Sequence, residues 1–390
     1  PNLEPPNPEP TLNPEPCTLN RIQSLPRRTF IKWAGATALA AVPACAPRPF
    51  TVARPQRRFA RVIVSPERII RTIAGLRPYR PSGFVLRAER FGEKLLVHDY
   101  GHGGGGVTLS WGTARLAIDE LAGWTGPADR AAVVGCGAVG LATARLLQRR
   151  GATVTIYAKD VPPNTTSNIA GAQWGPFSVF ERGKTTAAFD EQFGRAAQLA
   201  WRLFQELPGP TYGIRWIENY SVGDTPDAGP PQSPFYVNGV DLGPREHPFP
   251  ARYVRRFTTM LIEPPIYMTA LLRDFLLAAG RLVIREFTSR DEMLALDEPV
   301  IFNCTGLGAR ALVADDELMP VKGQLTFLLP QPEIDYITLL DGPLYMFPRS
   351  DGILLGGTFE RGNWSLEPDP EAEKRILEGH RRFFEAMVNG

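Results

Sequence analysis

Hydrophobic residues recur in short runs along residues 62–390, and the polar residues between them predict a succession of strands and helices. The runs 84–90 and 94–98 flank a Phe-Gly-Glu turn and predict a pair of strands, and a helical pattern follows over 110–121. Farther along, the pattern predicts a strand over 131–134, a helix over 141–150, a strand over 152–158 and a last helix over 371–387. The strand–helix–strand order over 131–158 is the context in which a nucleotide-binding turn is expected.

The turn between the strand 131–134 and its helix reads Gly135-Cys136-Gly137-Ala138-Val139-Gly140. Its glycines let the chain turn tightly, let the backbone approach a pyrophosphate, and let the helix pack against the sheet. The start of the helix supplies N–H donors and partial positive charge to the phosphates. The spacing therefore predicts a dinucleotide site that includes Gly135, Gly137, Ala138, Val139 and Gly140.

This fingerprint places an acidic residue on the ribose about twenty residues past its final glycine. Lys159 stands about there, and Asp160 follows it. Asp160 is the predicted ribose ligand if the register shifts by one residue; otherwise another group holds the ribose. We interpret Lys159 as a solvated turn residue rather than as the sign of a phosphorylated ribose.

The composition of the 390 residues, 43% hydrophobic and 22% charged, is that of a globular chain with two domains or one large one. It excludes collagen, coiled coil and disorder of the whole chain. A net charge of +2 predicts no nucleic-acid partner. Four cysteines and four histidines without metal-ligand spacing predict neither a disulfide scaffold nor a metal site. The expected partner is a small molecule.

The N-terminal part of the chain has a different composition. Seven of the first seventeen residues are proline, so residues 1–26 are predicted to be a disordered tail. Arg27 and Arg28, followed by Phe30 and an apolar, alanine-rich run, make residues 27–46 resemble a twin-arginine signal peptide. The apolar run is about fifteen residues long, which is too short for a transmembrane span. Residues 47–61 then form a linker.

Such a signal predicts export of the folded protein by the twin-arginine translocase to the periplasm or another extracytoplasmic location. The alternative interpretation is a basic patch before a buried helix. Processing is expected near residues 44–46, and lipid anchoring at Cys45 is left open because Pro43 fits a lipoprotein cleavage box badly. The mature chain would keep only Cys136 and Cys304, so disulfides would be optional.

Other motifs lie along the rest of the chain. They are Pro163 to Trp174, Asn303-Cys304-Thr305-Gly306, Lys322-Gly323-Gln324, Tyr345-Met346-Phe347-Pro348, and Leu355 to Phe359 with Asn363-Trp364. Together with the glycine fingerprint, these motifs resemble the D-amino-acid oxidase family over most of residues 131–386. The closing motifs of that family are an Arg-Pro-x-Arg-Pro run, a His-x-Tyr-Gly-His-Gly-Gly loop and a Thr-x-x-Trp-Gly helix start. Here they stand at 75–81, 98–104 and 108–112, ahead of the fingerprint.

Each motif occurs once, so this order predicts a circular permutation rather than a chimera of two partial genes. The usual C-terminal helix would join the first strand through residues 122–130, and new ends would open after the helix 371–387. The resemblance implies an α/β fold with an FAD-binding Rossmann-like domain and an α+β substrate domain built on an antiparallel sheet. Within residues 62–390 we expect the FAD-binding domain mainly over 99–180, 281–325 and 351–390, and the substrate domain mainly over 62–98, 181–280 and 326–350.

The resemblance also implies roles for single residues. Arg77 would bind the substrate carboxylate as a bidentate partner, and the Tyr345 hydroxyl would meet the same carboxylate. Gly104 would offer a carbonyl to the substrate amine. Arg80 is interpreted as a structural arginine, and Cys304 as a small buried residue rather than a nucleophile. The other residues implied to bind the cofactor are Thr165, Thr166, Ser167, Gly171, Ala172, Gln173, Thr305, Gly103, Gly104, Gly105, Gly106, Val107 and Thr108.

For each assignment a structural alternative exists: a core aromatic for Tyr345, a flexible linker for the glycine run, and a polar turn for residues 165–167. The implied cofactor is FAD, held non-covalently because no Cys or His adjoins the expected ring position. The implied reaction converts D-amino acids and dioxygen to 2-oxo acids, ammonia and hydrogen peroxide through hydride transfer to flavin N5. The alternatives are a glycine- or sarcosine-type amine oxidase, a quinone-linked D-amino-acid dehydrogenase, and a non-catalytic flavin-binding protein. The sequence predicts no particular oligomeric state.

One position departs from the family pattern. Asp341 stands where the vertebrate-type enzymes carry a lid tyrosine, four residues before Tyr345. An acid at the lid favours neutral or basic D-amino acids over D-aspartate as substrates.

Overall fold

The computed structural model describes residues 57–171, 173–207, 209–225 and 234–388. The chain divides into two units, 1–54 and 55–390, and the second carries all the described elements. The predicted tail, the signal segment 27–46 with Cys45, and most of the linker lie outside the described residues. Among the described residues, no helix combines the length and the apolar character that crossing a membrane requires.

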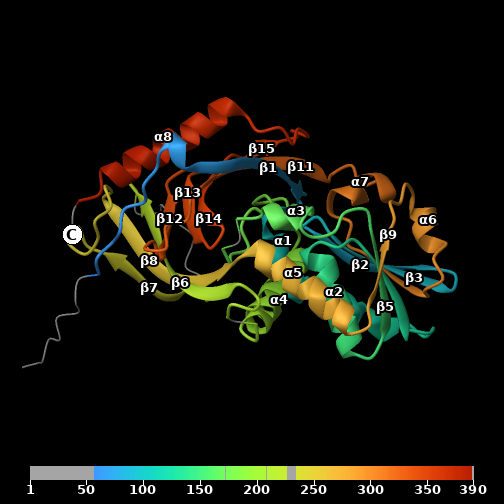
Figure 1. The fold of residues 1–390 in the computed structure, drawn as a ribbon. Helices are drawn as coiled ribbons and strands as arrows, with labels where there is room; N and C mark the ends of the chain where they lie inside the picture. Colours follow the sequence, from blue (N-terminus) through green and yellow to red (C-terminus); the bar gives the residue numbers. More distant parts are fainter. Residues whose placement is uncertain (1–56, 172, 208, 226–233, 389–390) are drawn as a thin grey trace, which may run out of the picture. The chain divides into compact units, whose positions relative to one another are not determined.

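One half of the second unit is a six-stranded sheet in the order β2-β3-β10-β4-β5-β9 (Figure 1). The neighbours from β3 to β9 run parallel, whereas β2 is antiparallel to β3. Parallel strands place the loops at their carboxyl ends on one edge of the sheet, where ligands of such folds bind. The strands are β2 (Val85–Phe91), β3 (Lys94–Tyr100), β4 (Arg130–Val134), β5 (Thr153–Ala158), β9 (Arg281–Ile284) and β10 (Val300–Asn303).

Helices cover both faces of this sheet. Ala131 and Val133 of β4 share one core cluster with side chains of α1, α2, α4 and α5, whereas Ala132 and Val134 share another with Met293 of α6. A strand buried on both faces needs an unbroken apolar run, which residues 131–134 of β4 supply after the exposed Arg130. The helices are α1 (Gly106–Asp119), α2 (Ala138–Arg149), α3 (Thr166–Ile169), α4 (Ala187–Phe204), α5 (Pro264–Leu277), α6 (Arg290–Leu294) and α7 (Ala309–Leu312).

The other half is a nine-stranded, mostly antiparallel sheet in the order β1-β11-β14-β13-β12-β6-β8-β7, with β15 paired to β11. β12 and β6 form its parallel pair. The strands are β1 (Ile69–Tyr79), β6 (Ile214–Gly223), β7 (Val237–Leu242), β8 (Tyr253–Ile262), β11 (Met319–Leu328), β12 (Tyr336–Leu340), β13 (Tyr345–Arg349), β14 (Gly352–Gly356) and β15 (Glu360–Arg361). Short 3₁₀ turns stand at Pro66–Arg68, Gly103–Gly105, Glu120–Gly123 and Gly306–Gly308.

The last helix, α8 (Pro370–Glu385), lies over one face of this nine-stranded sheet (Figure 1). Its Ile376 and Phe384 share a cluster with Val62 and Val64, so the first described segment packs under the same helix. The Arg61 guanidinium donates a hydrogen bond to the carbonyl of Met387. The two ends of the described body therefore lie side by side.

The structure agrees with the mixed α/β fold expected from the sequence and refines the elements. α1 begins at Gly106 rather than near residue 110, because the glycine run already turns helically. The expected division of the domains differs in two places. β2 and β3, expected mainly in the substrate domain, pair within the six-stranded sheet, and α8, expected in the FAD-binding domain, packs on the nine-stranded sheet. Strand pairing and helix packing join segments that the linear motifs could not assign.

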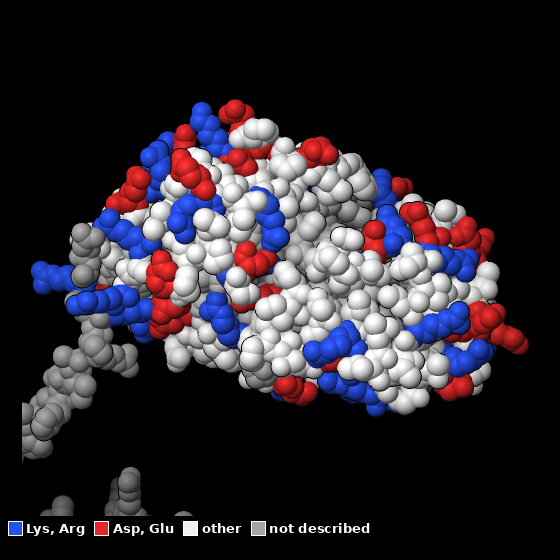
Figure 2. Space-filling model, in the orientation of Figure 1, with Lys and Arg blue, Asp and Glu red and all other residues white. Residues whose placement is uncertain are grey.

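On the face drawn in Figure 2, basic and acidic side chains are interspersed, with no large area of one sign. This mixture is what a net charge of +2 from 43 basic and 41 acidic residues predicts.

Candidate functional site

A cavity of about 1350 Å³ is lined by the carboxyl ends of the parallel strands and by β1 and β13 of the other sheet. This volume exceeds that of ordinary small-molecule pockets, roughly 300–1,000 Å³, and suits a dinucleotide together with a small substrate. Of the predicted site residues, the cavity is lined by members of the glycine fingerprint, of the loop after β3 and of the segment after β5, together with Arg77 and Tyr345. The fold brings these distant segments to one place.

The fingerprint turn leads from β4 into α2 with backbone packed against backbone. A Cβ on Gly135, whose φ is +116°, would lie 2.3 Å from the Cys304 carbonyl oxygen, and a Cβ on Gly140 would lie 2.0 Å from the Gly135 oxygen. A Cβ on Gly137 would instead meet only Ser167 Oγ, at 3.2 Å. The outer two glycines therefore close the turn, and the middle one leaves its cavity side open.

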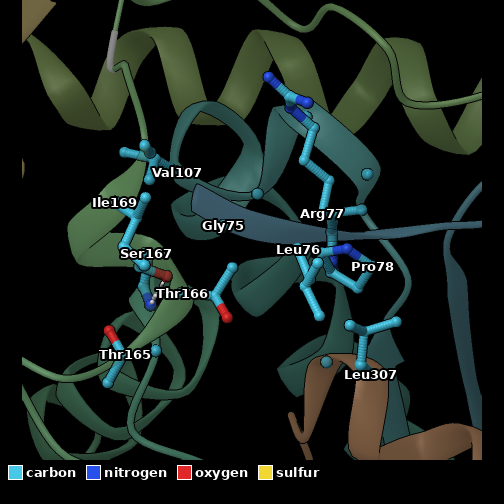
Figure 3. Close-up of a pocket in the computed structure, with 18 of the residues that line it drawn as sticks. Gly75, Leu76, Arg77, Pro78, Val107, Thr165, Thr166, Ser167, Ile169 and Leu307 are labelled. Carbon is cyan, nitrogen blue, oxygen red and sulfur yellow. Dashed lines mark hydrogen bonds between the residues drawn. The ribbon is translucent and has the colours of Figure 1, made fainter. Parts of the chain in front are cut away.

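The start of α2 meets the polar segment that follows β5. Ser167 Oγ accepts a hydrogen bond from the Ala138 N–H at 3.0 Å, and the Thr165 hydroxyl donates to Asn168 Oδ1 at 2.7 Å. Thr166 opens the short helix α3 beside them (Figure 3). A helix N-terminus surrounded by hydroxyls, with a glycine on its open side, is a suitable cradle for phosphate groups.

Beside β4 in the same sheet, β5 ends at Ala158 and is followed by the residues predicted at the ribose. Lys159 and Asp160 both line the cavity and are exposed. The Lys159 ammonium pairs with Glu286 Oε1 at 3.6 Å, so its charge has a partner on the neighbouring chain segment. Asp160 stays the predicted ribose ligand.

The loop after β3 packs tightly against residues 176–178. Gly103 has a φ of +56°, and a Cβ there would lie 2.1 Å from the Ser178 oxygen. The Gly104 N–H donates to the same oxygen at 2.9 Å, and Gly105 faces Val179. Thr108 Oγ1 bonds both the carbonyl and the N–H of Gly175. These contacts order the glycine run, which the flexible-linker alternative does not predict; Gly106 and Val107 continue it along the cavity wall.

Two buried groups lie beneath this loop. His102 Nε2 is 3.2 Å from Asp99 Oδ1 and 3.2 Å from Thr113 Oγ1, and its ring stacks on Phe84. Asp99 has no exposed surface, and burial raises the pKa of its carboxyl above the usual value while His102 lowers it in part. The turn at Gly101 is thus linked to α1 through a buried acid–imidazole contact.

At the proposed substrate end of the cavity, two large side chains each lie against a glycine of a neighbouring strand. Arg77 leaves β1 on the side opposite to Leu76 and Pro78 (Figure 3). A Cβ on Gly323 would lie 2.3 Å from Arg77 Nη1, and a Cβ on Gly356 would lie 2.1 Å from Tyr345 Cζ. Glycine at both positions therefore leaves the space that the guanidinium and the phenol ring occupy.

Arg77 and Tyr345 lie next to each other. Burial raises the pKa of the Tyr345 hydroxyl, and the neighbouring Arg77 lowers it in part. Arg77 Nη1 donates to the Thr358 carbonyl at 3.4 Å, and the Phe359 ring lies 5.9 Å away. A cation beside a protonated phenol is a suitable pair for one carboxylate.

Arg80 points to a different set of partners. Its guanidinium bonds Asp315 at 2.8 Å and Glu317 at 2.8 Å and also reaches the Gly83 carbonyl. The two arginines of the Arg-Pro-x-Arg-Pro run thus divide into one that lines the cavity and one held in an ion-pair network.

The segment after α3 crosses to the nine-stranded sheet. Gly171 sits against the Phe347 ring, where a Cβ would lie 2.8 Å from Cε2. Gln173 is buried and donates to Asn219 Oδ1 at 2.6 Å. Ala172, predicted to lie near the same edge of the cofactor, falls outside the described residues.

Thr305 and the cysteines complete the wall. The Thr305 hydroxyl donates to Asn303 Oδ1 at 2.7 Å, and Asn303 Nδ2 lies 3.1 Å from His98 Nδ1. Burial raises the pKa of the Cys136 thiol to about 12 and raises that of Cys304 as well. Both thiols are free and buried, so neither is poised as a thiolate nucleophile.

Asp341 occupies the turn between β12 and β13. Its side chain is exposed, its N–H donates to the Val222 carbonyl at 2.9 Å, and the residue lines the cavity. The Asp341 carboxylate therefore lies at the substrate end of the cavity and is exposed to solvent.

Sequence reasoning gave no role in the site to several residues that shape the substrate end: Gly323, Gly356, Thr358 and Asn219. The first three lie inside motifs that the sequence did single out, Lys-Gly-Gln and Leu-Gly-Gly-Thr-Phe. A glycine in a strand signals a close approach, so the motifs could have revealed the space that Arg77 and Tyr345 fill. Nothing in the sequence marks Asn219.

Comparisons with known proteins identify the family of the chain. The family model described as FAD dependent oxidoreductase matches residues 12–120 and 130–389. A D-amino-acid oxidase of Rubrobacter xylanophilus is 33% identical over 260 residues, covering 64% of this chain and 75% of the relative. A human D-aspartate oxidase is 30% identical over 263 residues, covering 64% of this chain and 74% of the relative.

Among solved structures, the glycine oxidase from Geobacillus kaustophilus superposes with a TM-score of 0.50 at 18% identity. The superposition covers 67% of this chain and 81% of the glycine oxidase. At this level of identity the likeness concerns the fold.

Proposed function

Because the chain belongs to the family of FAD-dependent oxidoreductases, we propose that it is a D-amino-acid oxidase that oxidises neutral or basic D-amino acids. The observation that carries the proposal is the placement of Arg77 and Tyr345, side by side, in the cavity that the glycine fingerprint also lines. Relatives named D-amino-acid oxidase support it. The products are the 2-oxo acid, ammonia and hydrogen peroxide.

The residues present fit FAD. Backbone amides at the start of α2, the hydroxyls of Thr165, Thr166 and Ser167, and the open side of Gly137 would hold its phosphates, and Asp160 its ribose. The loop 103–108 and the segment 171–173 would lie against its ring. When bound, FAD supplies the chemistry, accepting the hydride from the substrate α-carbon and passing the electrons to dioxygen.

Binding and orientation are the tasks of the chain itself. Arg77 offers two N–H donors to the substrate carboxylate, and Tyr345, whose raised pKa keeps its hydroxyl protonated at neutral pH, offers a third. The Gly104 carbonyl would accept from the substrate amine. With carboxylate and amine both fixed, the α-C–H has one direction in which to point, and this orientation selects one enantiomer.

The test is anaerobic mixing of the purified protein with D- and L-amino acids, glycine and sarcosine while the visible flavin band is followed. We expect bleaching by neutral and basic D-amino acids, and recovery in air with release of peroxide. Arg77→Ala should keep its flavin and lose on the order of a thousandfold in kcat/KM, since two charge-assisted hydrogen bonds are removed. Bleaching by glycine or sarcosine alone would identify an amine oxidase, and no bleaching at all a flavin-binding protein.

The electron acceptor is tested in the same cuvette. Reoxidation by air at a rate that supports turnover is the expected result. Slow recovery in air but rapid recovery with a soluble quinone would identify the dehydrogenase alternative instead.

We also propose that the chain is a circular permutant. The two segments of the family match meet at the junction between α1 and β4, which supports the predicted joint at residues 122–130. The contact between Arg61 and Met387 supports the predicted position of the new ends. A rearranged gene that starts at residue 130, joins residue 388 to residue 57 through a short linker and ends at residue 121 should fold and bind FAD with unchanged affinity. Loss of folding on this rearrangement would contradict the permutation.

Finally, we propose that residues 27–46 direct export by the twin-arginine route to an extracytoplasmic location. The support is the paired arginines and the short apolar run. Replacing Arg27 and Arg28 by lysines should leave a reporter fused after residue 56 in the cytoplasm, whereas the unaltered segment exports it. If the exported parent protein carries a lipid label that the Cys45→Ala variant lacks, the protein is also lipid-anchored at Cys45. An unlabelled parent protein would exclude such an anchor.

A further inference from the structure

Strand β13 contributes other residues to the site besides Tyr345. Successive residues of a strand alternate between its faces, so Tyr345, Phe347 and Arg349 share one face. The rings of Tyr345 and Phe347 stack 4.9 Å apart, and Phe347 supports Gly171. Arg349 Nη1 donates to the Ala170 carbonyl at 3.1 Å. One strand face therefore contacts both the expected substrate carboxylate and the segment that leads from α3 to Gln173.

The Arg349 guanidinium is a buried charge whose three nitrogens each donate a hydrogen bond. The residue is 4% exposed, and Nε and Nη2 each bond an oxygen of Asp351 at 2.8 Å. One face of the guanidinium lies 5.1 Å from the Phe327 ring. Burying a charge is costly unless it is paired and hydrogen-bonded, and the bidentate acid fixes the guanidinium in one orientation. Nη1 is then aimed at Ala170.

Segment 167–174 is held at both ends by other contacts. Ser167 bonds the start of α2, and the Trp174 N–H donates to the Met260 carbonyl at 2.7 Å. Between them, Ile169 packs on Gly75 and Gly171 on Phe347 through apolar surfaces, and Gln173 donates to Asn219. The hydrogen bond from Arg349 adds a charged donor at Ala170, between the tie at Ser167 and the tie at Gln173.

We propose that Arg349, clamped by Asp351, is a positioning residue that sets the backbone of Ala170 and Gly171 against the ring end of FAD. It acts through Ala170 and contacts neither the substrate carboxylate site nor the phosphate cradle. The inference about cofactor binding rests only on membership of the FAD-dependent family. Its kinetic consequence rests in addition on the proposed oxidase function.

Arg71, which contacts the same ring and the same acid, offers a matched control. The Arg71 guanidinium lies 4.3 Å from Phe327, and its Nη2 bonds Asp351 at 2.7 Å. Among the contacts of the described residues, Arg71 shares the ring and the acid with Arg349 but has no bond to Ala170. Arg71→Met removes a guanidinium from the same cluster and leaves the segment's hydrogen bond in place.

The experiment compares Arg349→Met with Arg71→Met. Each apoprotein is titrated with FAD while flavin fluorescence is followed, and the visible band of each holoprotein is recorded with benzoate as a carboxylate probe. We expect Arg349→Met to weaken FAD binding on the order of tenfold or more and to alter the band's fine structure, because a charge-assisted hydrogen bond is lost. Arg71→Met should stay within about threefold of the parent. Equal FAD affinities and spectra for both variants would overturn the proposal.

Turnover gives a second readout. In Arg349→Met, kcat should fall by about tenfold while KM for a D-amino acid stays within about threefold, because Arg77 and Tyr345 still bind the carboxylate. A rise in KM with unchanged kcat would contradict a role through Ala170 and Gly171. If the parent protein binds FAD but oxidises no D-amino acid, the proposed function fails, and the contrast in FAD affinity still decides on Arg349.

If Arg349→Met does not fold, substitutions at Asp351 and a conservative change at Arg349 test the same proposal. Asp351→Asn keeps the guanidinium and its bond to Ala170 but removes the charge that orients it, so FAD affinity should fall less than in Arg349→Met, by about threefold to tenfold. Arg349→Lys cannot hold two oxygens of Asp351 and Ala170 in one plane, and it should behave like Arg349→Met. Full FAD affinity in both of these variants would overturn the proposal as well.

Discussion

The two ends of the cavity are built by opposite means. At the cofactor end, the wall is backbone: Gly135 and Gly140 bring main chains within contact, and the loop 103–105 lies against the Ser178 carbonyl. At the substrate end, Gly323 and Gly356 instead make room for two large side chains, Arg77 and Tyr345. Glycine serves close packing of backbone in one region and placement of functional groups in the other.

The ligands proposed for the two regions account for this difference. Phosphates and a planar ring accept hydrogen bonds from backbone N–H groups, which every residue except proline supplies and which glycine allows to come close. A carboxylate and an α-amine of one hand need donors at a few fixed points, and side chains such as arginine supply these. Substitutions should therefore damage the cofactor end by adding atoms and the substrate end by removing them.

The largest expected effect is at Gly140. In Gly140→Ala the new Cβ would meet the Gly135 oxygen, so the apoprotein should lose roughly 3 kcal/mol of unfolding free energy from overpacking and should not retain FAD. Urea unfolding of the apoprotein and FAD titration measure the two effects.

Gly137→Ala is the control within the same turn. Its Cβ would meet only Ser167 Oγ, so the unfolding free energy of the apoprotein should change by about 0.5 kcal/mol or less, while FAD affinity falls because the open side of the turn is filled. Equal losses of stability in the two variants would contradict the distinction between the closing glycines and the open one.

The second effect concerns the helix behind the substrate end. His380 of α8 lies buried with Nε2 3.1 Å from the Tyr345 carbonyl, and burial lowers its pKa to about 4. An unfolded histidine has a pKa of about 6.5, so the unfolded chain binds this proton first as the pH falls. The stability that the neutral imidazole contributes is present above pH 6.5 and should decline by about 3 kcal/mol between pH 6.5 and pH 4.

His380→Gln tests this assignment, because its amide keeps a donor for the Tyr345 carbonyl and takes up no proton. The unfolding free energy of the parent should fall more steeply than that of the variant between pH 7 and pH 4. Parallel pH profiles for the two proteins would show that His380 is not the group responsible.

Tyr345→Phe should have a smaller effect and one confined to the substrate end. Removing the hydroxyl takes away one hydrogen bond to the substrate carboxylate, so KM for a D-amino acid should rise about tenfold while FAD affinity stays constant. Steady-state kinetics and FAD titration measure both values. A weakened FAD affinity with unchanged KM would place the hydroxyl at the cofactor. It would contradict the assignment of Tyr345 to the substrate end alone.

Asp341→Asn should have the smallest effect. An exposed carboxylate acts on a substrate cation through water, so the ratio of kcat/KM for D-lysine to that for D-leucine should fall about threefold, and less at high salt. The D-leucine value itself serves as the control. An unchanged ratio would remove Asp341 from the account of specificity, and D-aspartate as the best substrate would contradict it.

The sequence predicted the cofactor end better than the substrate end. The fingerprint 135–140 is local: strand, turn and helix follow one another in the chain, so their spacing alone predicts the turn that the structure contains. Arg77 and Tyr345 lie on strands far apart in sequence, and only the resemblance to a family suggested that they meet. Likewise, nothing local predicts that Arg349 reaches Ala170.

Local spacing also misplaced parts of the body. The resemblance places β2 and β3 mainly in the substrate domain, yet β3 pairs with β10 in the six-stranded sheet. α8 was expected with the FAD-binding domain, and its apolar face instead packs on the nine-stranded sheet. Hydrogen bonding between strands and burial of a helix face are long-range choices, to which neighbouring residues in the chain contribute little.

The order of residues thus fixes what depends on neighbours: the glycine turn, the start of α2, and the hydrophobic runs of β4 and β5. The tertiary structure decides what depends on distance: the pairing of Arg77 with Tyr345, the glycine spaces beneath them, and the contact from Arg349 to Ala170. The physical reason is that backbone conformation responds to adjacent residues, whereas side-chain contacts between distant segments form only when burial of the hydrophobic faces has set the register of the strands.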